Sequence, residues 1–214
     1  HCDEALDKQA GSYAEMAELI FAVNSFDINS FDKQLAKYYE KFGHERVLVS
    51  IVAPMVERLA LLSVLNRLDK VIEEFFLNRL MINIIELAAN FPATNNKHAK
   101  KILIIQSQQN LIPVNHAIVN LLSLIADYSV VVYYNVIENE YLKRINALFK
   151  PDFVFTEFSK SSSDDKVLKR AKAMSKAFKN SSVFFCGKKV ELLSNKLPDG
   201  VYFVENVRDF YKIM

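Results

Sequence analysis

Ile102-Leu103-Ile104-Ile105 and Val130-Val131-Val132-Tyr133-Tyr134 are the stretches that decide the fold of the second half of this chain. Both are short apolar runs, which are typical of strands buried on both faces of a parallel sheet. Three similar runs follow at Phe153–Phe155, Val183–Cys186 and Val201–Val204. Segments with helical periodicity separate the runs, and strand–helix alternation predicts a parallel sheet covered by helices. Five such strands favour the flavodoxin-like order, with a ligand crevice at the carboxyl ends of the strands.

The helices of this half are predicted from the spacing of apolar residues and from residues typical of helix N-termini. Residues 164–180 form the clearest example, because Ser163 can cap the helix and Asp164 and Asp165 suit its positive N-terminus. The helices expected in this half span residues 113–126, 138–149, 164–180, 189–194 and 208–214.

The first half has the periodicity of helices throughout. The expected helices span residues 13–23, 31–42, 44–65 and 68–91, with a kink or break at Pro54 and a stop at Pro92. The last of them is apolar almost all round, so we expect it to be the buried helix of a four-helix bundle. A polar linker over residues 92–98 divides the chain into a helical bundle, 1–94, and a flavodoxin-like domain, 99–214.

Composition limits the classes of protein to consider. The chain has 214 residues, of which 51% are apolar and 24% charged, so it can bury a core. Residues 1–96 carry 9 Lys/Arg and 14 Asp/Glu and the rest carry 18 and 11, so the net charges are −5 and +7. The two cysteines, Cys2 and Cys186, exclude a disulfide scaffold and fit a reducing compartment. We expect a cytoplasmic protein without a signal peptide or membrane span, and, because no Met begins the chain, a fragment.

Motifs of common enzymes and nucleotide-binding proteins are missing. The turn after the first strand, residues 106–113, contains no glycine, which argues against a phosphate-binding loop. No Gly-x-Ser-x-Gly elbow is present, and His44, His98 and His116 are scattered, so neither a hydrolase nor a metal site is indicated. We expect no enzyme activity. We expect His116 to be a partly exposed helix residue, the alternative being a role at the mouth of the crevice.

Charged side chains give weaker signals. Glu73 and Glu74 are adjacent on a helix and point about 100° apart, so both cannot face the core, and adjacency does not make an acid–base pair. The helix over residues 164–180 is strongly basic, and we interpret its lysines as a solvated face rather than as a partner or nucleic-acid surface.

The order of parts resembles a known family, and one segment carries the likeness. Between Pro54 and Phe75 the chain is similar to the helical bundle of the cobalamin-binding module of MerR-type, light-responsive transcription regulators. In that family, a Trp and a Glu-His-Phe sequence follow the proline. The resemblance runs without a gap over these residues and loosely from Tyr13 to the end of the chain, and the cobalamin-binding module of methionine synthase is also similar.

Several positions depart from the family pattern. The family's Trp, which covers the upper face of the corrin, falls on Ser63, and its Glu-His pair falls on Glu73 and Glu74. The family's lower histidine, which ligates cobalt, falls on Pro113, and a shift of one helical turn would reach His116. The resemblance therefore implies a kept fold without bound cobalamin and no other cofactor or metal. A remaining small-molecule site between bundle and α/β domain would be lined by Ser63, Glu73, Glu74, Gln108, Gln109 and Pro113, with Tyr133 or Tyr134 nearby.

These implications favour an effector-sensing and oligomerisation module of a MerR-like transcription regulator. We expect a homodimer or homotetramer, an unidentified small-molecule effector, and DNA contact only through a domain that precedes this chain. The alternative is a corrinoid-binding protein, either a cobalamin sensor or a methyl-transfer carrier, with a non-standard site. A purely structural interaction domain is the third hypothesis.

Overall fold

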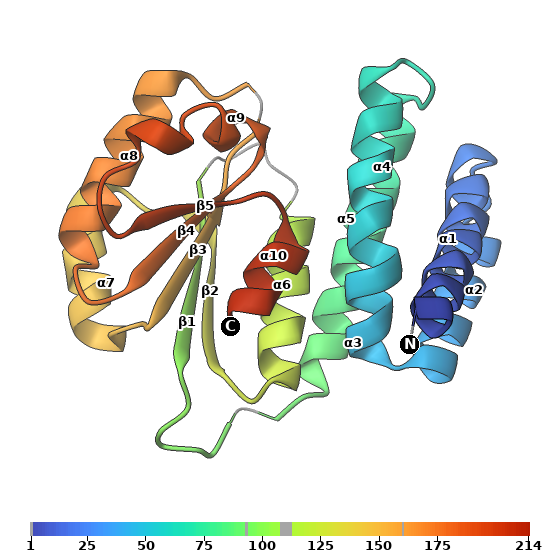
Figure 1. Cartoon of the computed structure of the whole chain (residues 1–214), viewed down its shortest axis with the longest axis horizontal. Coiled ribbons are helices and arrows are strands. Elements are labelled where there is room, and N and C mark those ends of the chain that lie inside the picture. The colour runs from blue at the N-terminus through green and yellow to red at the C-terminus, as the bar shows by residue number, and fades with distance from the viewer. Residues whose placement is uncertain (1, 93, 108–112, 160) are drawn as a thin grey trace. The chain divides into compact units, whose positions relative to one another are not determined.

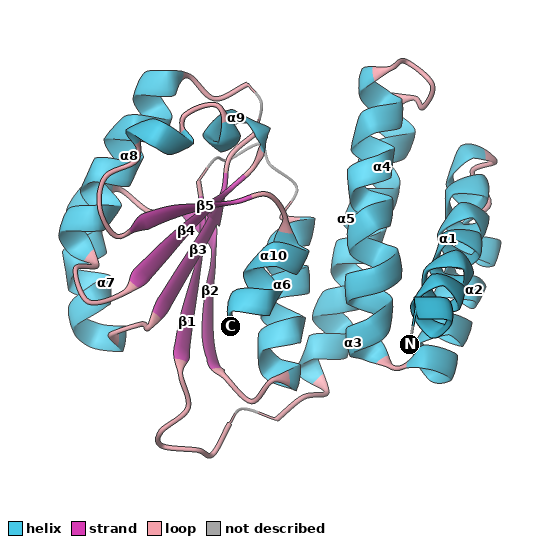
Figure 2. Ribbon diagram, viewed as in Figure 1, coloured by secondary structure: helices cyan, strands magenta, loops and turns pink. Residues whose placement is uncertain are grey.

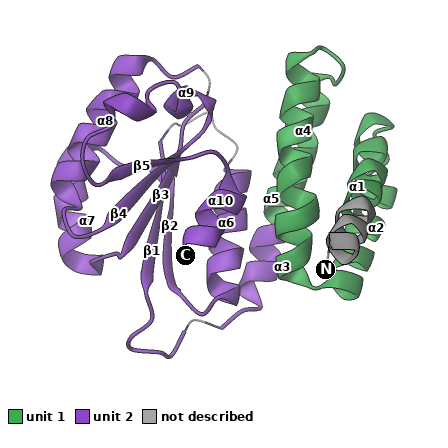
Figure 3. Cartoon of the chain, in the orientation of Figure 1, with its two compact units in different colours: residues 1–82 green, residues 83–214 purple. Residues whose placement is uncertain are grey.

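The computed structural model describes residues 2–92, 94–107, 113–159 and 161–214 (Figure 1). The chain divides into two compact units, His1–Ile82 and Asn83–Met214 (Figure 3). The divide falls within a helix, whereas the sequence placed it at the linker of residues 92–98.

The first unit is helical, as expected. Its elements are α1 (Cys2–Asn24), α2 (Ile28–Phe42), α3 (His44–Val47), a π-helical turn (Leu48–Val52), α4 (Ala53–Val64) and α5 (Lys70–Ala89), which continues into the second unit. The side chain of Asp27 caps α2 by accepting a 3.0 Å hydrogen bond from the Ser30 N–H. Gly43 ends α2 with a φ of 79°, a conformation that glycine adopts without strain.

The break expected at Pro54 takes the form of the π-helical turn that precedes it. Proline lacks the N–H that would continue the α-helical ladder, and here the N–H of Ala53 bonds five residues back, to Leu48. The run His44–Val64 nevertheless stays helical, and by length and a mean hydropathy of 1.9 alone it could cross a membrane, which the sequence analysis did not expect. Several of its apolar residues, among them Val47, Leu48 and Met55, are core residues of the first unit, and core helices commonly meet the same criterion.

The expectation that α5 is buried on all sides is wrong. One stripe is buried, with Phe76, Leu80 and Ile84 each no more than 1% exposed, while Val71 is 74% and Ile82 53% exposed. The stripe packs on aromatic rings, because Phe76 lies 5.0 Å from Phe31, centroid to centroid. A helix with apolar residues on nearly every side therefore keeps an exposed apolar face.

The second unit confirms the α/β prediction. The strands are β1 (Lys101–Gln106), β2 (Ser129–Val136), β3 (Phe153–Glu157), β4 (Ser182–Cys186) and β5 (Val201–Val204). All pairs are parallel, and the order is β2-β1-β3-β4-β5, which is the flavodoxin-like order. The helices are α6 (Val114–Ile125), α7 (Leu142–Phe149), α8 (Asp164–Ala177), α9 (Lys188–Glu191) and α10 (Val207–Ile213), with 3-10 turns at Asn139–Tyr141 and Ser194–Lys196.

Helices cover both faces of this sheet, with α6 and α10 on one side and α7 and α8 on the other (Figure 2). The residues of β1 and β4 are nearly all apolar because both faces of these strands are buried. The edge strand β2 differs from the expectation, since Tyr133 and Tyr134 are exposed. On the α10 side, Phe155 and Phe184 lie 4.9 and 5.1 Å from Phe210, centroid to centroid. Cys186 is buried at the end of β4, which confirms its interpretation as a small core residue.

Candidate functional site

The carboxyl ends of β1 and β3 mark the place where a ligand is expected in this topology. From β1 the chain continues into α6 on one face of the sheet, and from β3 into α8 on the other face. Neighbouring strands whose connections leave toward opposite faces form the switch point at which open α/β sheets bind ligands.

Polar side chains from three segments meet at this switch point. The carboxylate Oε1 of Glu157, the last residue of β3, accepts a 2.8 Å hydrogen bond from Nδ2 of Asn115 in the first turn of α6. The hydroxyl of Ser107, directly after β1, donates to the backbone carbonyl of Glu157. We call Ser107, Asn115 and Glu157 the edge cluster.

Glu157 has the chemistry of a proton-exchanging group. Its burial raises the pKa of the carboxyl from 4.5 to about 7, and the hydrogen bond from Asn115 opposes this rise only in part. Both protonation states are therefore populated near neutral pH. The group can accept or donate a hydrogen bond to a bound polar molecule.

Thr156 precedes Glu157 on β3, so its side chain points to the opposite face of the sheet. Its side chain is fully buried, and its hydroxyl has no hydrogen-bond partner within the described part of the chain. A buried hydroxyl without a partner costs about 1–3 kcal/mol, so such groups call for a specific explanation.

His116 contradicts the expectation of a partly exposed histidine. Its side chain is fully buried, its ring packs edge-on against Phe155 at 5.8 Å, and neither ring nitrogen has a partner among the described residues. Burial lowers the pKa of the imidazole from 6.5 to about 4, so it is neutral at physiological pH. The residue lies on the face of α6 that packs on the sheet, because the apolar period of α6 carries it inward.

The predicted site residues of the second unit are described only in part. Gln108 and Gln109 lie outside the described residues. Pro113 is partly buried and occupies the N-cap position of α6, two residues before Asn115. It therefore stands next to the edge cluster. Tyr133 and Tyr134, at the end of β2, are 40% and 37% exposed.

The predicted site residues of the first unit lie on α4 and α5. Ser63 is partly buried near the end of α4. Glu73 is buried at 9% exposure, whereas Glu74 is exposed and its carboxylate lies 3.7 Å from Nζ of Lys70. The expectation that only one of the two glutamates faces the core is confirmed. A shared site made by these residues and Pro113 stays a prediction.

Asn115 and Glu157 were missed in the sequence. Glu157 carries a usable signal, because a carboxylate that directly follows an apolar strand lies at the carboxyl edge of the sheet. Asn115 carries none, since its role depends on the side of α6 that faces β3. Among the described residues, no group of three or more His, Cys, Asp and Glu could hold a metal ion.

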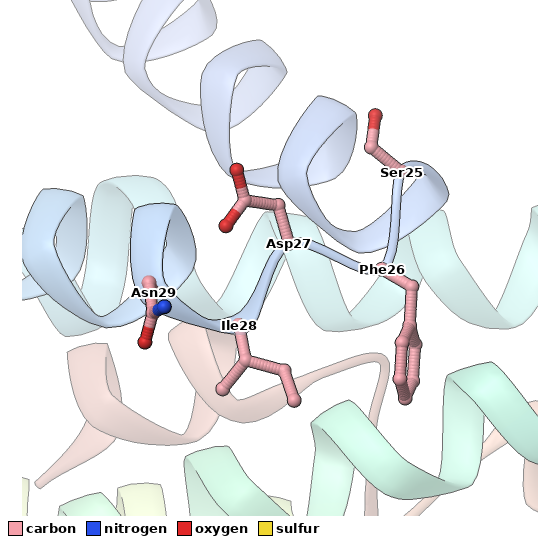
Figure 4. Close-up of a pocket in the computed structure, with 5 residues that line it drawn as sticks. All are labelled: Ser25, Phe26, Asp27, Ile28 and Asn29. Atoms are coloured by element: carbon pink, nitrogen blue, oxygen red, sulfur yellow. The ribbon is translucent and has the colours of Figure 1, made fainter.

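A hollow of about 540 Å³ lies at the α1–α2 turn of the first unit (Figure 4). Its lining residues are Ser25, Phe26, Asp27, Ile28 and Asn29. The Asp27 carboxylate already accepts from the backbone and hydroxyl of Ser30, so it serves the end of the helix.

Comparison with known proteins returned only solved structures. No protein-family model and no curated protein matches the chain. The chain is similar to a structure of the methanol:cobalamin methyltransferase complex MtaBC from Methanosarcina barkeri, at 12% identity and a TM-score of 0.44, over 94% of this chain and 78% of that one. It is also similar to a cobalamin-binding protein from Desulfitobacterium hafniense DCB-2, at 15% identity and a TM-score of 0.46, over 93% of this chain and 96% of that one.

Proposed function

We propose that this chain is a cytoplasmic effector-sensing and oligomerisation module of a MerR-like transcription regulator, without enzyme activity, and that a small polar molecule other than cobalamin is its effector. The observation that carries the proposal is the edge cluster at the switch point of the sheet, where Asn115 and Glu157 meet. Any DNA contact belongs to a domain outside these residues.

The chemistry of the edge cluster supports a polar effector. Glu157 offers a carboxyl that exchanges a proton near pH 7, and Asn115 offers a side-chain amide beside it. A ligand with amide, hydroxyl or carboxyl groups would complement these atoms. An effector that binds one assembly state more tightly would shift the population of the assemblies.

Two positions support the absence of cobalamin. Pro113, where the family has its lower histidine, has no side-chain nitrogen that could ligate cobalt. His116 has both ring nitrogens buried against the sheet, so it cannot replace that ligand without leaving the core. Among the described residues of α6, none is therefore placed to ligate cobalt in the position of the family's lower histidine.

The test is to mix the purified chain with adenosylcobalamin or methylcobalamin in the dark and separate it by gel filtration, recording visible absorbance and light scattering. We expect a colourless protein peak. Corrinoid that co-elutes in stoichiometric amount would overturn the proposal in favour of a corrinoid-binding protein. A matched run with Glu157→Gln separates specific retention at the edge cluster from retention elsewhere.

The effector site is tested separately by thermal-shift screening of small amides, hydroxy acids and carboxylic acids. We expect at least one class to stabilise the wild-type chain, and the shift to be lost in Asn115→Leu. A screen in which the two chains respond alike to every compound would exclude the edge cluster as the effector site.

A further inference from the structure

A second surface of the α/β unit has the properties of a protein interface. A hollow of about 440 Å³ lies between the end of β2 and helix α7. Its lining includes Tyr133, Ile137, Glu138, Tyr141, Arg144 and Leu148. We call this surface the β2–α7 groove.

The groove gathers large side chains that are open to solvent. Tyr133 is 40%, Tyr141 51% and Leu148 80% exposed. Single exposed apolar residues are ordinary, but a group around one hollow marks an interaction site. Tyrosine and arginine are also the residues that most often anchor protein interfaces.

Hydrogen bonds from a buried arginine fix the loop that forms one wall of the groove. Nη1 of Arg170, a buried side chain of α8, donates hydrogen bonds of 2.7 Å to the carbonyl of Ile137 and 2.6 Å to Oδ1 of Asn139. Two anchored points fix the loop between β2 and α7. A partner would therefore meet a surface that needs little ordering on binding.

The strand beside the groove is an edge strand of the sheet. Within the described part of the chain β2 pairs only with β1, and its eight residues include no charged residue and no proline. Natural proteins commonly place charges or proline on such strands, or cover them. The register with β1 shifts after Tyr133, so the end of β2 leaves the regular ladder next to the groove.

The charges of the groove indicate which partner fits. Its lining includes one acidic residue, Glu138, and one basic residue, Arg144, so its formal net charge is zero. It therefore does not favour a strongly acidic or a strongly basic partner. A twofold axis midway between Glu138 and Arg144, perpendicular to the line that joins them, would place Arg144 of each copy opposite Glu138 of the other. We propose that a second copy of this chain docks on the β2–α7 groove. This inference rests on the oligomerisation part of the proposed function and names its surface.

The test compares sedimentation velocity of the wild-type chain and variants over a concentration series. Tyr141→Ser with Leu148→Ser removes two exposed anchors, and we expect it to weaken dimerisation by at least tenfold. Tyr202→Ser with Leu192→Ser is the matched control, because these residues are 51% and 75% exposed outside the groove. The control should dimerise like the wild type.

Arg144→Glu tests the charge pairing. We expect it to weaken the dimer at low salt and to regain part of the affinity at high salt, because each new carboxylate would face Glu138 of the other copy. Circular dichroism is used to check that each variant is folded.

Two outcomes separate the inference from the proposed function. A wild-type dimer that all groove variants leave unchanged would overturn the groove as the interface while oligomerisation stands. A wild-type monomer at every concentration would overturn both the groove and the oligomerisation role, and would leave the effector site to its own test.

Discussion

Nδ2 of Asn115 lies 2.8 Å from Oε1 of Glu157 and joins the start of α6 to the end of β3. This bond crosses the switch point of the sheet. It ties the two segments that would have to move apart if a ligand entered between them. The protonation state of Glu157 therefore links the stability of the α/β unit to its binding chemistry.

Glu157→Gln should make stability less dependent on pH. The folded-state pKa of about 7 lies above the ordinary 4.5, so the folded wild type holds a proton that the unfolded chain loses between these values. Wild-type stability therefore falls as pH rises through this window. Glutamine keeps an oxygen for Asn115 without the ionisation, so the variant should gain up to about 3 kcal/mol over the wild type by pH 8. Urea unfolding at pH 5 and pH 8 measures this, and an unchanged pH slope would contradict it. Glu205→Gln, at an exposed position, is the control.

His116→Leu should remove a pH dependence of the opposite sign. Burial lowers the folded-state pKa to about 4, so below pH 6.5 the unfolded chain gains a proton that the folded chain refuses. The free energy of unfolding of the wild type should decrease by about 1.4 kcal/mol for each unit by which the pH is lowered from 6 to 4. This slope should disappear in the variant. The slope, and not the absolute stability, is the readout, because leucine also changes packing against Phe155. His98→Gln in the exposed loop should keep the wild-type slope.

Gly187→Ala should destabilise the chain by roughly 2–4 kcal/mol. The residue has a φ of 117°, and an added Cβ would lie 2.3 Å from the carbonyl oxygen of Phe158. Gly200→Ala is the matched control, since its φ of 79° is also positive but its Cβ would meet no atom within 4 Å. It should cost only about 1–2 kcal/mol, for the backbone conformation alone. Equal losses in urea unfolding would show that the close approach to Phe158 has no effect.

Restoring the family residues should create cobalamin affinity if the alignment over Pro54–Phe75 is correct. The combined substitution Ser63→Trp, Glu74→His and Pro113→His supplies an aromatic cover and two imidazoles, and imidazole nitrogen is a common metal ligand. We expect at least a tenfold gain in affinity for adenosylcobalamin, measured by absorbance titration in the dark. Ser63→Trp alone is the control without a new imidazole. No gain from the triple variant would count against the alignment.

Much of the fold could be predicted because its signals are local. The apolar run beginning at Ile102 indicates a strand buried on both faces, and Ser163 marks the start of α8 because its side chain accepts a hydrogen bond from the N–H of Lys166. Gly43 ends α2 where a left-handed conformation is needed. Each of these signals acts within a few residues, so the sequence is sufficient to show it.

Other features depend on what lies next to a residue in space. The sequence determined by itself the helical first half, the strand–helix alternation and the division of Glu73 and Glu74 between core and solvent. The tertiary structure decided that α5 keeps an exposed face, that His116 is buried on Phe155, and that Asn115 meets Glu157 across 42 positions. Burial and pKa depend on neighbours that folding brings from distant parts of the chain, and a periodic pattern carries no information about which neighbours those are.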